Sequence, residues 1–107
     1  MIDYNLAMYK IKKMAEFDVW FSEIRDSLTQ RGLGARLRKV ALGNFGDIAP
    51  IADSKGIWEM REHFGVGWRM YYVKRNQVVV VMLGGGCKAS QTADIKAVKK
   101  LLESLED

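Results

Sequence analysis

The chain is 107 residues long and 49% hydrophobic, which is ordinary for a globular protein, so we expect a single domain over residues 1–107. Its 17 Lys and Arg residues outnumber 13 Asp and Glu residues, and the net charge of +4 favours anionic partners without identifying one. A single cysteine excludes an internal disulfide, and no apolar run is long enough to span a membrane, so we expect a cytoplasmic protein.

The first half of the chain predicts one strand and a pair of helices. Residues 9–14 alternate weakly between apolar and basic side chains, which predicts an edge strand whose lysines face water. Five apolar residues then recur at the spacing of one helix face, and these are Phe17, Trp20, Phe21, Ile24 and Leu28. We therefore predict one amphipathic helix across this segment.

A second helix is predicted from Leu33 or Gly34 to Leu42, with a stop at Gly43 and Asn44. Three basic residues are expected on its outer face, namely Arg36, Arg38 and Lys39. The two helices should form a hairpin packed on a sheet. Residues 47–53, which contain the only proline, predict an extended loop or a short edge strand.

Two alternating segments, residues 58–64 and 68–73, predict neighbouring antiparallel strands. In the first, Trp58, Met60, Glu62 and Phe64 share one face, and in the second Trp68, Met70 and Tyr72 form an apolar face. The side chains expected on the opposite face are Glu59, Arg61 and His63 in the first strand, and Arg69, Tyr71 and Val73 in the second. A three-residue hairpin loop at residues 65–67, with Gly67 at positive φ, would set the register. It predicts three facing pairs: Phe64 with Trp68, Arg61 with Tyr71, and His63 with Arg69.

A tight turn near Arg75 and Asn76 should lead to a third strand, from Gln77 to Leu83. Its run of four valines suits a strand that is buried on both faces and therefore central in the sheet. The glycines at positions 84–86 predict a turn after this strand, where the backbone can approach an anion closely.

The last helix is predicted to begin near Ser90 or Gln91, with the Ser90 hydroxyl as its N-cap. Lys88 then lies just before the N-terminus of this helix, where free amides and the helix dipole favour an anion. The segment does not match a phosphate-binding P-loop, because Ala89 follows the lysine.

Three short motifs follow one another in the second half of the chain: Glu59-Met60-Arg61, the run Gly65 to Tyr72, and the three glycines followed by Lys88, Ser90 and Gln91. Their order and spacing resemble the RelE/ParE superfamily of bacterial toxins, and within it the HigB-like group of addiction-module killer proteins. The resemblance covers nearly the whole chain. It implies an α+β fold in which an N-terminal strand and a helical hairpin pack on a small antiparallel sheet, with a C-terminal helix.

The same resemblance implies a toxin that an antitoxin encoded in the same operon holds inactive, and that cuts messenger RNA on the ribosome when released. By motif position, the implied catalytic residues are Arg61, Arg69 and Lys88. The candidate RNA-binding residues are His63, Tyr71, Ser90 and Gln91. Trp68 departs from the tyrosine common before the arginine, which preserves stacking and removes any hydroxyl role at that position.

RNA cleavage without a metal needs a base for the 2′-hydroxyl, cations that stabilise charge on the phosphate, and an acid for the departing oxygen. Arginine suits the second task because its planar fork matches phosphate oxygens, and one such donor contributes roughly 3 kcal/mol to lowering the barrier. Lys88 fits phosphate binding or proton transfer. The other proton-transfer candidates are Glu59, His63 and Tyr71. No cofactor is expected, and a lone histidine argues against a histidine-based metal site.

Simpler interpretations stand beside these. Arg61 and Arg69 could pair with Glu59 or Glu62 on a solvated sheet face, and Cys87 could be an incidental thiol. Three functions therefore remain open at this point. They are a ribosome-dependent endoribonuclease, a ParE-like toxin that inhibits gyrase, and an inactive member of the fold that binds only an antitoxin or nucleic acid.

Overall fold

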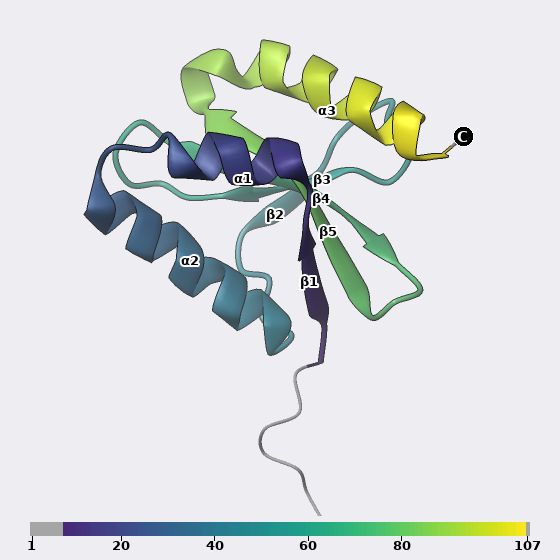
Figure 1. Cartoon of the computed structure of the whole chain (residues 1–107), viewed down its shortest axis with the longest axis horizontal. Helices are drawn as coiled ribbons and strands as arrows, with labels where there is room; N and C mark the ends of the chain where they lie inside the picture. Colours follow the sequence, from purple (N-terminus) through teal and green to yellow (C-terminus); the bar gives the residue numbers. More distant parts are fainter. Residues whose placement is uncertain (1–7, 107) are drawn as a thin grey trace, which may run out of the picture.

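The computed structural model describes residues 8–106 of the chain. They form a sheet with helices on both faces (Figure 1). In chain order the elements are β1 (Lys10–Lys13), α1 (Ala15–Ser22), α2 (Ser27–Ala41), β2 (Ile48–Pro50), β3 (Trp58–Arg61), β4 (Trp68–Arg75), β5 (Val79–Cys87), the 3₁₀ turn η1 (Lys88–Ser90) and α3 (Gln91–Glu106). The strand order is β1-β5-β4-β3-β2. No described helix is long and apolar enough to cross a membrane.

The N-terminal strand β1 lies at one edge of the sheet, as its lysines predict. It pairs in parallel with β5, so that Lys10 lies opposite Val79 and Lys13 opposite Met82. A parallel pair requires a crossover, and here α1 and α2 carry the chain from β1 to β2 at the opposite edge. The sheet is therefore mixed: β2 to β5 form the predicted antiparallel sheet, and β1 adds to its edge in parallel. The short edge strand predicted within residues 47–53 is confirmed as β2.

The predicted helix from Phe17 to Leu28 is broken in two. The chain leaves the helical conformation after Ser22, and Asp26 caps a new helix by accepting hydrogen bonds from the Leu28 amide (3.1 Å) and the Thr29 hydroxyl (2.8 Å). The bond from Thr29 lowers the pKa of the Asp26 carboxyl. Leu28, expected in the core, is 68% exposed because it lies in the first turn of α2 and not in α1. The predicted start near Leu33 was thus six residues too late.

The β3–β4 hairpin has the predicted faces and a different register. Arg61 pairs with Arg69, and Glu59 pairs with Tyr71, so each facing pair is shifted by two residues from the prediction. The reason is the loop, which spans residues 62–67 instead of the three glycine-rich residues alone. A shift of two residues keeps every side chain on its predicted face, because the side-chain period of a strand is two.

Strand β5 extends beyond the predicted end at Leu83 and includes all three glycines. Asn76 and Gln77, both at positive φ, form the tight turn that precedes it. An irregularity in the β4–β5 ladder lies between Tyr71 and Tyr72, which pair with Gly84 and Met82. The prediction of a glycine turn was therefore wrong, and the predicted interior position of the strand is confirmed.

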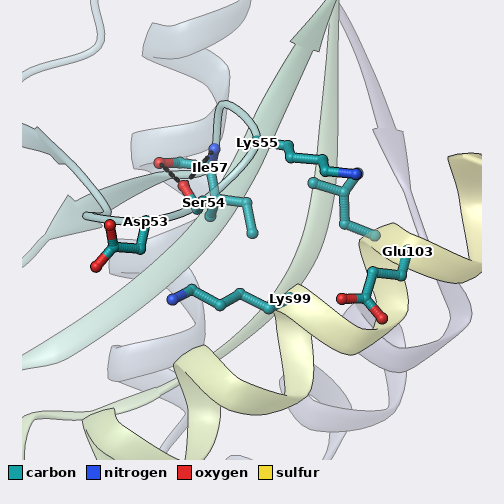
Figure 2. A pocket seen from close by; sticks show the side chains of 7 residues that line it. Asp53, Ser54, Lys55, Ile57, Lys99 and Glu103 are labelled. Atoms are coloured by element: carbon teal, nitrogen blue, oxygen red, sulfur yellow. Dashed lines mark hydrogen bonds between the residues drawn. The ribbon is translucent and has the colours of Figure 1, made fainter.

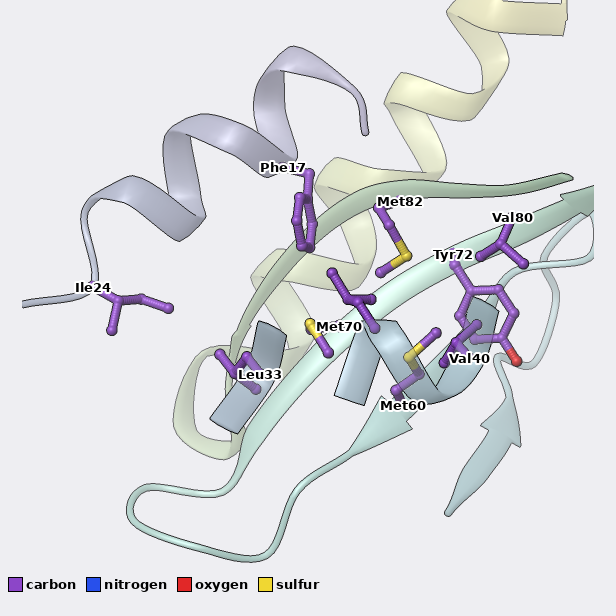
Figure 3. Packing of buried hydrophobic residues seen from close by; sticks show 10 residues of the cluster. Phe17, Ile24, Leu33, Val40, Met60, Met70, Tyr72, Val80 and Met82 are labelled. Atoms are coloured by element: carbon purple, nitrogen blue, oxygen red, sulfur yellow. The ribbon is translucent and has the colours of Figure 1, made fainter. Parts of the chain in front are cut away.

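Hydrophobic side chains pack in two layers, one on each face of the sheet. On the face covered by α1 and α2, Met60, Met70 and Met82 from three strands are fully buried under Phe17 and Leu33 (Figure 3). The α3 face carries a second cluster that consists of Ile57, Tyr71, Val73, Val81, Leu83, Val98 and Leu102. The alternation of β3 and β4 thus places Glu59, Arg61, Arg69 and Tyr71 on the α3 face, whereas His63 lies beyond β3 in the loop.

Tyr72 makes stability dependent on pH in the alkaline range. Its side chain is fully buried, its hydroxyl lacks a hydrogen-bond partner among the described residues, and burial raises its pKa to about 12. In the unfolded chain the phenol ionises near pH 10. The contribution of the neutral, buried phenol to the free energy of unfolding is therefore complete below about pH 10 and is lost as the pH rises toward about 12.

We expect Tyr72→Phe to reduce this alkaline loss, and to leave the free energy of unfolding at neutral pH unchanged or higher by up to about 1 kcal/mol. Tyr71, whose pKa burial also raises, should account for the remaining pH dependence. Urea unfolding across the alkaline range measures both effects. An alkaline slope identical in the variant and the parent chain would contradict the prediction.

Candidate functional site

Two arginines face each other on the α3 side of the sheet. Arg61 and Arg69 are direct partners across β3 and β4, and Gly86 flanks Arg69 on β5. The side chain of Arg61 is 37% exposed, whereas Arg69 is only 8% exposed. Like charges directly opposite each other destabilise a sheet. The sequence brings these cations together at an energetic cost, which is a common property of functional sites.

Glu59 links Arg61 to α3. It is buried at 5% exposure, and its carboxylate accepts a hydrogen bond from Arg61 Nε (2.9 Å) on one oxygen and from Gln91 Nε2 (2.6 Å) on the other. Gln91 is the first residue of α3, so this carboxylate joins the end of β3 to the start of the helix. The predicted pairing of Arg61 with Glu59 is confirmed, but it occurs in a buried setting and not on a solvated face.

Among the described residues, Arg69 has no such carboxylate partner. Its Nη1 donates to the backbone carbonyl oxygens of Trp68 (3.2 Å) and Glu62 (3.5 Å), and its Nε is buried without a hydrogen-bond partner among residues 8–106. The neighbouring Tyr71 hydroxyl is likewise buried and unpartnered within that range. A buried cation without a counter-ion carries a large desolvation cost, which an incoming anion would offset.

Lys88 completes the group of cations. A Cβ placed on Gly67 would stand 3.2 Å from the Cβ of Lys88 and 3.7 Å from Nη1 of Arg69, so both side chains lie around this glycine. The backbone amide of Lys88 also donates to the carbonyl of Val66 (3.4 Å). Gly67 has φ of 76°, which favours glycine there. Lys88 is exposed and lies beside the loop at residues 62–67.

Helix α3 begins at Gln91, as predicted, but the predicted capping role of Ser90 was wrong. The Ser90 hydroxyl does not cap the helix; it accepts from the Cys87 amide (3.2 Å) and donates to the carboxylate of Asp94. That carboxylate occupies the position that a Cβ on Gly86 would take. Asp94 thus supplies the negative charge that a helix N-terminus favours, and the glycines admit protein side chains where the sequence predicted an approaching anion.

The remaining predicted residues lie in unequal settings. His63 is exposed and its Nε2 lies 2.6 Å from a carboxylate oxygen of Asp47, a hydrogen bond that lowers the pKa of Asp47. Tyr71 is fully buried, and its ring offers no surface to a ligand. Burial raises the pKa of Tyr71, and the charge of Glu59 raises it further. The Ser90 hydroxyl lowers the pKa of the Cys87 thiol.

Arg36 is the residue that the sequence placed wrongly. It was predicted on the outer face of α2, yet it is 8% exposed and bonds to the end of β3. The sequence spacing already indicated that Arg36 is buried, because it lies three residues after Leu33 and four before Val40, on the buried stripe of the helix. An arginine on that stripe is expected to be buried, with hydrogen-bond acceptors for its N–H groups.

A separate hollow of about 100 Å³ lies between the β2–β3 loop and the second half of α3. Asp53, Lys55, Lys99 and Glu103 surround it, so its lining has mixed charge (Figure 2). Lys99 is eight residues beyond Gln91 on α3, or about 12 Å along the helix axis. The hollow is distinct from the arginine site. No group of three or more His, Cys, Asp or Glu residues within residues 8–106 is arranged to bind a metal ion.

Comparison with known proteins identifies one relative and one structural neighbour. No protein-family model matches the chain. An uncharacterized protein of Haemophilus influenzae is 38% identical over 96 residues, which cover 90% of this chain and 95% of that protein. An arginine double mutant of the E. coli toxin RelE, solved in the free state, aligns with a TM-score of 0.62 and 18% identity over 88% of this chain and 97% of that one. The predicted RelE-like fold is therefore confirmed, and the chain belongs to one family with the Haemophilus influenzae protein.

Proposed function

We infer that this chain is the toxin of a toxin–antitoxin pair, and that it inhibits translation by cleaving messenger RNA on the ribosome. Its likeness in fold to the toxin RelE supports a toxin. The observation that carries the nuclease is the buried guanidinium of Arg69, which faces Arg61 and has no carboxylate partner among the described residues. A phosphate of RNA is an anion whose oxygens match such guanidinium groups.

In the proposed reaction the 2′-oxygen of the RNA attacks the adjacent phosphorus, and a new P–O bond forms as the bond to the next 5′-oxygen breaks. Glu59 accepts the proton of the 2′-hydroxyl, and Lys88 donates a proton to the departing 5′-oxygen. Arg61 and Arg69 stabilise the negative charge that builds on the phosphate oxygens. The products are a 2′,3′-cyclic phosphate and a 5′-hydroxyl end.

Glu59 is chosen as the base because of its contacts. It lies 2.9 Å from Nε of Arg61, whereas His63 binds Asp47 on the outer surface and Tyr71 is fully buried. Each carboxylate oxygen of Glu59 makes one hydrogen bond and so retains a lone pair for a proton. The exposed His63 and the polar residues Ser90 and Gln91 remain available as contacts to the RNA chain outside the scissile phosphate.

The other parts of the proposal follow from the same resemblance in motif order. We place the chain in the HigB-like group, with a cytoplasmic location and an antitoxin from the same operon as its partner. The proposed nuclease uses no cofactor. The basic site and the apolar surface beside it could be covered by a strand or helix of that partner.

The direct test is cleavage of a defined messenger RNA in a reconstituted translation reaction. We expect new 5′ ends, mapped by primer extension, when the purified chain is added to translating ribosomes. The same RNA without ribosomes should remain largely intact. A transcript that stays intact in both reactions would overturn the nuclease proposal.

Glu59→Gln should separate proton transfer from RNA binding. The amide keeps the shape of the side chain and cannot accept the proton, so we expect kcat to fall by roughly 10²–10⁴-fold. Affinity for an RNA with a 2′-deoxy scissile nucleotide should change little, since Arg61, Arg69 and Lys88 remain. Single-turnover cleavage and RNA binding measure the two quantities. Glu103→Gln, exposed on α3, is the matched control, and a Glu59→Gln variant with near wild-type kcat would exclude this base.

A further inference from the structure

Arg36 in α2 is buried and uses all of its hydrogen-bonding capacity. Its guanidinium group has five N–H donors, and each has an acceptor in the structure. Two bonds go to the carbonyl of Phe45 (3.1 and 2.7 Å) and one to that of Asp47 (2.8 Å). The other two go to the carbonyl of Arg61 (2.8 Å) and the carboxylate of Glu62 (2.6 Å). One side chain thus joins α2 to the loop before β2 and to the end of β3.

These bonds hold the backbone of Arg61 on both sides. Its carbonyl accepts from Arg36, and its amide donates to the carbonyl of Asp47 (2.9 Å), which is itself bound by Arg36. The Arg61 side chain is partly exposed and depends on this backbone for its direction toward Glu59. The position of one proposed phosphate-binding group is therefore set by a network centred on Arg36.

The same network extends to Arg69 through Glu62. The Glu62 carboxylate binds Arg36, its carbonyl accepts from Nη1 of Arg69 (3.5 Å), and its amide donates to the carbonyl of Trp68 (2.9 Å). The Trp68 carbonyl accepts from Arg69 as well (3.2 Å). Glu62 is the first residue of the β3–β4 loop, so a loop that moved at this end would displace one of the two hydrogen-bond acceptors that Arg69 has among residues 8–106. The other acceptor, the Trp68 carbonyl in β4, would lose its bond to the Glu62 amide.

Helix α2 itself does not require a charge at this position. Its neighbours on the buried stripe, Leu33, Leu37 and Val40, are apolar, and the guanidinium of Arg36 bonds only to groups outside the helix. The surrounding chain is nevertheless shaped to admit the guanidinium. Gly46 has φ of 67°, and a Cβ there would stand only 3.0–3.1 Å from guanidinium atoms of Arg36. An arginine accommodated in this way, and joined by hydrogen bonds, directly or through Glu62, to the segments that carry Arg61 and Arg69, indicates a role in placing these two side chains.

We propose that Arg36 is a positioning residue that fixes Arg61 and the β3–β4 loop, and through that loop Arg69, without touching RNA. This inference rests on the proposed function of the site. It predicts that Arg36→Met lowers kcat by about tenfold to a hundredfold, because displacements of about 1 Å at a reacting centre have effects of this size. KM should change little, since Lys88 and the arginine charges are still present. Arg36→Lys, which keeps the charge and fewer donors, should restore part of the loss.

The cleavage rate and amide hydrogen exchange together distinguish positioning from a general loss of stability. In Arg36→Met, hydrogen exchange should accelerate at the amides of Arg61 and Glu62 and remain slow in β5. This readout requires no RNA cleavage, so it tests the proposal even if the wild-type chain proves not to be a nuclease. Arg38→Met, which removes an exposed charge from the same helix, should have the kcat and the hydrogen-exchange rates of the wild-type chain.

If Arg36→Met fails to fold, Glu62→Gln decides the question, because it removes the charge of the ion pair and keeps the carbonyl that Arg69 uses. A lower kcat with unchanged KM, and faster exchange at Arg61, would support positioning. Wild-type kcat in either variant, or exchange that accelerates equally throughout the sheet, would overturn it.

Discussion

Arg69→Met should remove most RNA cleavage while leaving the fold as stable as before. Loss of one charge-stabilising donor costs roughly 10²–10³-fold in kcat. The free energy of unfolding should not fall, because the variant replaces a buried guanidinium without a carboxylate partner among residues 8–106 by an apolar side chain of similar length. It also removes the repulsion between Arg69 and Arg61. Activity should therefore fall without a fall in stability.

Cleavage rates and urea unfolding on the same preparations measure both effects. Lys96→Met is the matched control, because it removes one positive charge from the exposed surface of α3, and it should leave cleavage and stability unchanged. A parallel loss of stability and activity in Arg69→Met would mean that the arginine serves the fold. Full activity would mean that it does not contact the reacting phosphate.

Gly85→Ala should be strongly destabilising. Gly85 faces α1, and a Cβ at this position would overlap the indole ring of Trp20. That ring packs at centroid distances of 5.5 Å from Phe17 and 6.2 Å from Trp68, and moving it aside would disturb both contacts. Overpacking of this kind costs about 3 kcal/mol, or more when the backbone must shift. We expect a matching fall in the free energy of unfolding, measured by urea denaturation.

Gly34→Ala provides the control for a glycine replacement without a collision. The nearest atom to a Cβ on Gly34 is Nη1 of Arg38, at 3.7 Å, and the residue lies inside α2. Alanine is a better helix former than glycine, so this variant should be more stable by about 0.5–1 kcal/mol. Equal stability of the Gly85 and Gly34 variants would contradict the packing described around Trp20.

The faces of the central strands could be predicted from sequence because they depend only on alternation. Glu59, Arg61 and Arg69 share a face in any register that shifts by an even number of residues. The register itself depends on loop length, and the glycines at 65 and 67 suggested a loop shorter than the observed one. The sequence therefore predicted which side chains meet on one face, and missed that the two arginines are direct partners.

Other features depend on contacts between residues distant in the chain. Asp26 breaks the predicted helix because its carboxylate caps α2, a use that competes with continuing the helix through it. Arg36 is buried only because four acceptors from two other segments converge on it and take five hydrogen bonds. The three glycines looked like a turn because strands rarely contain them. In the structure they make room for Trp20, Asp94 and Val98 against β5.

Pulse labelling of protein, RNA and DNA synthesis in bacteria, just after induction of this chain, tests most directly whether it is a translation-blocking nuclease. We predict an early collapse of protein synthesis while DNA synthesis continues, and the Arg69→Met variant should abolish the effect. Early arrest of DNA synthesis with continued translation would contradict the nuclease and favour a gyrase inhibitor. Normal synthesis of all three would leave a protein that only binds its partners.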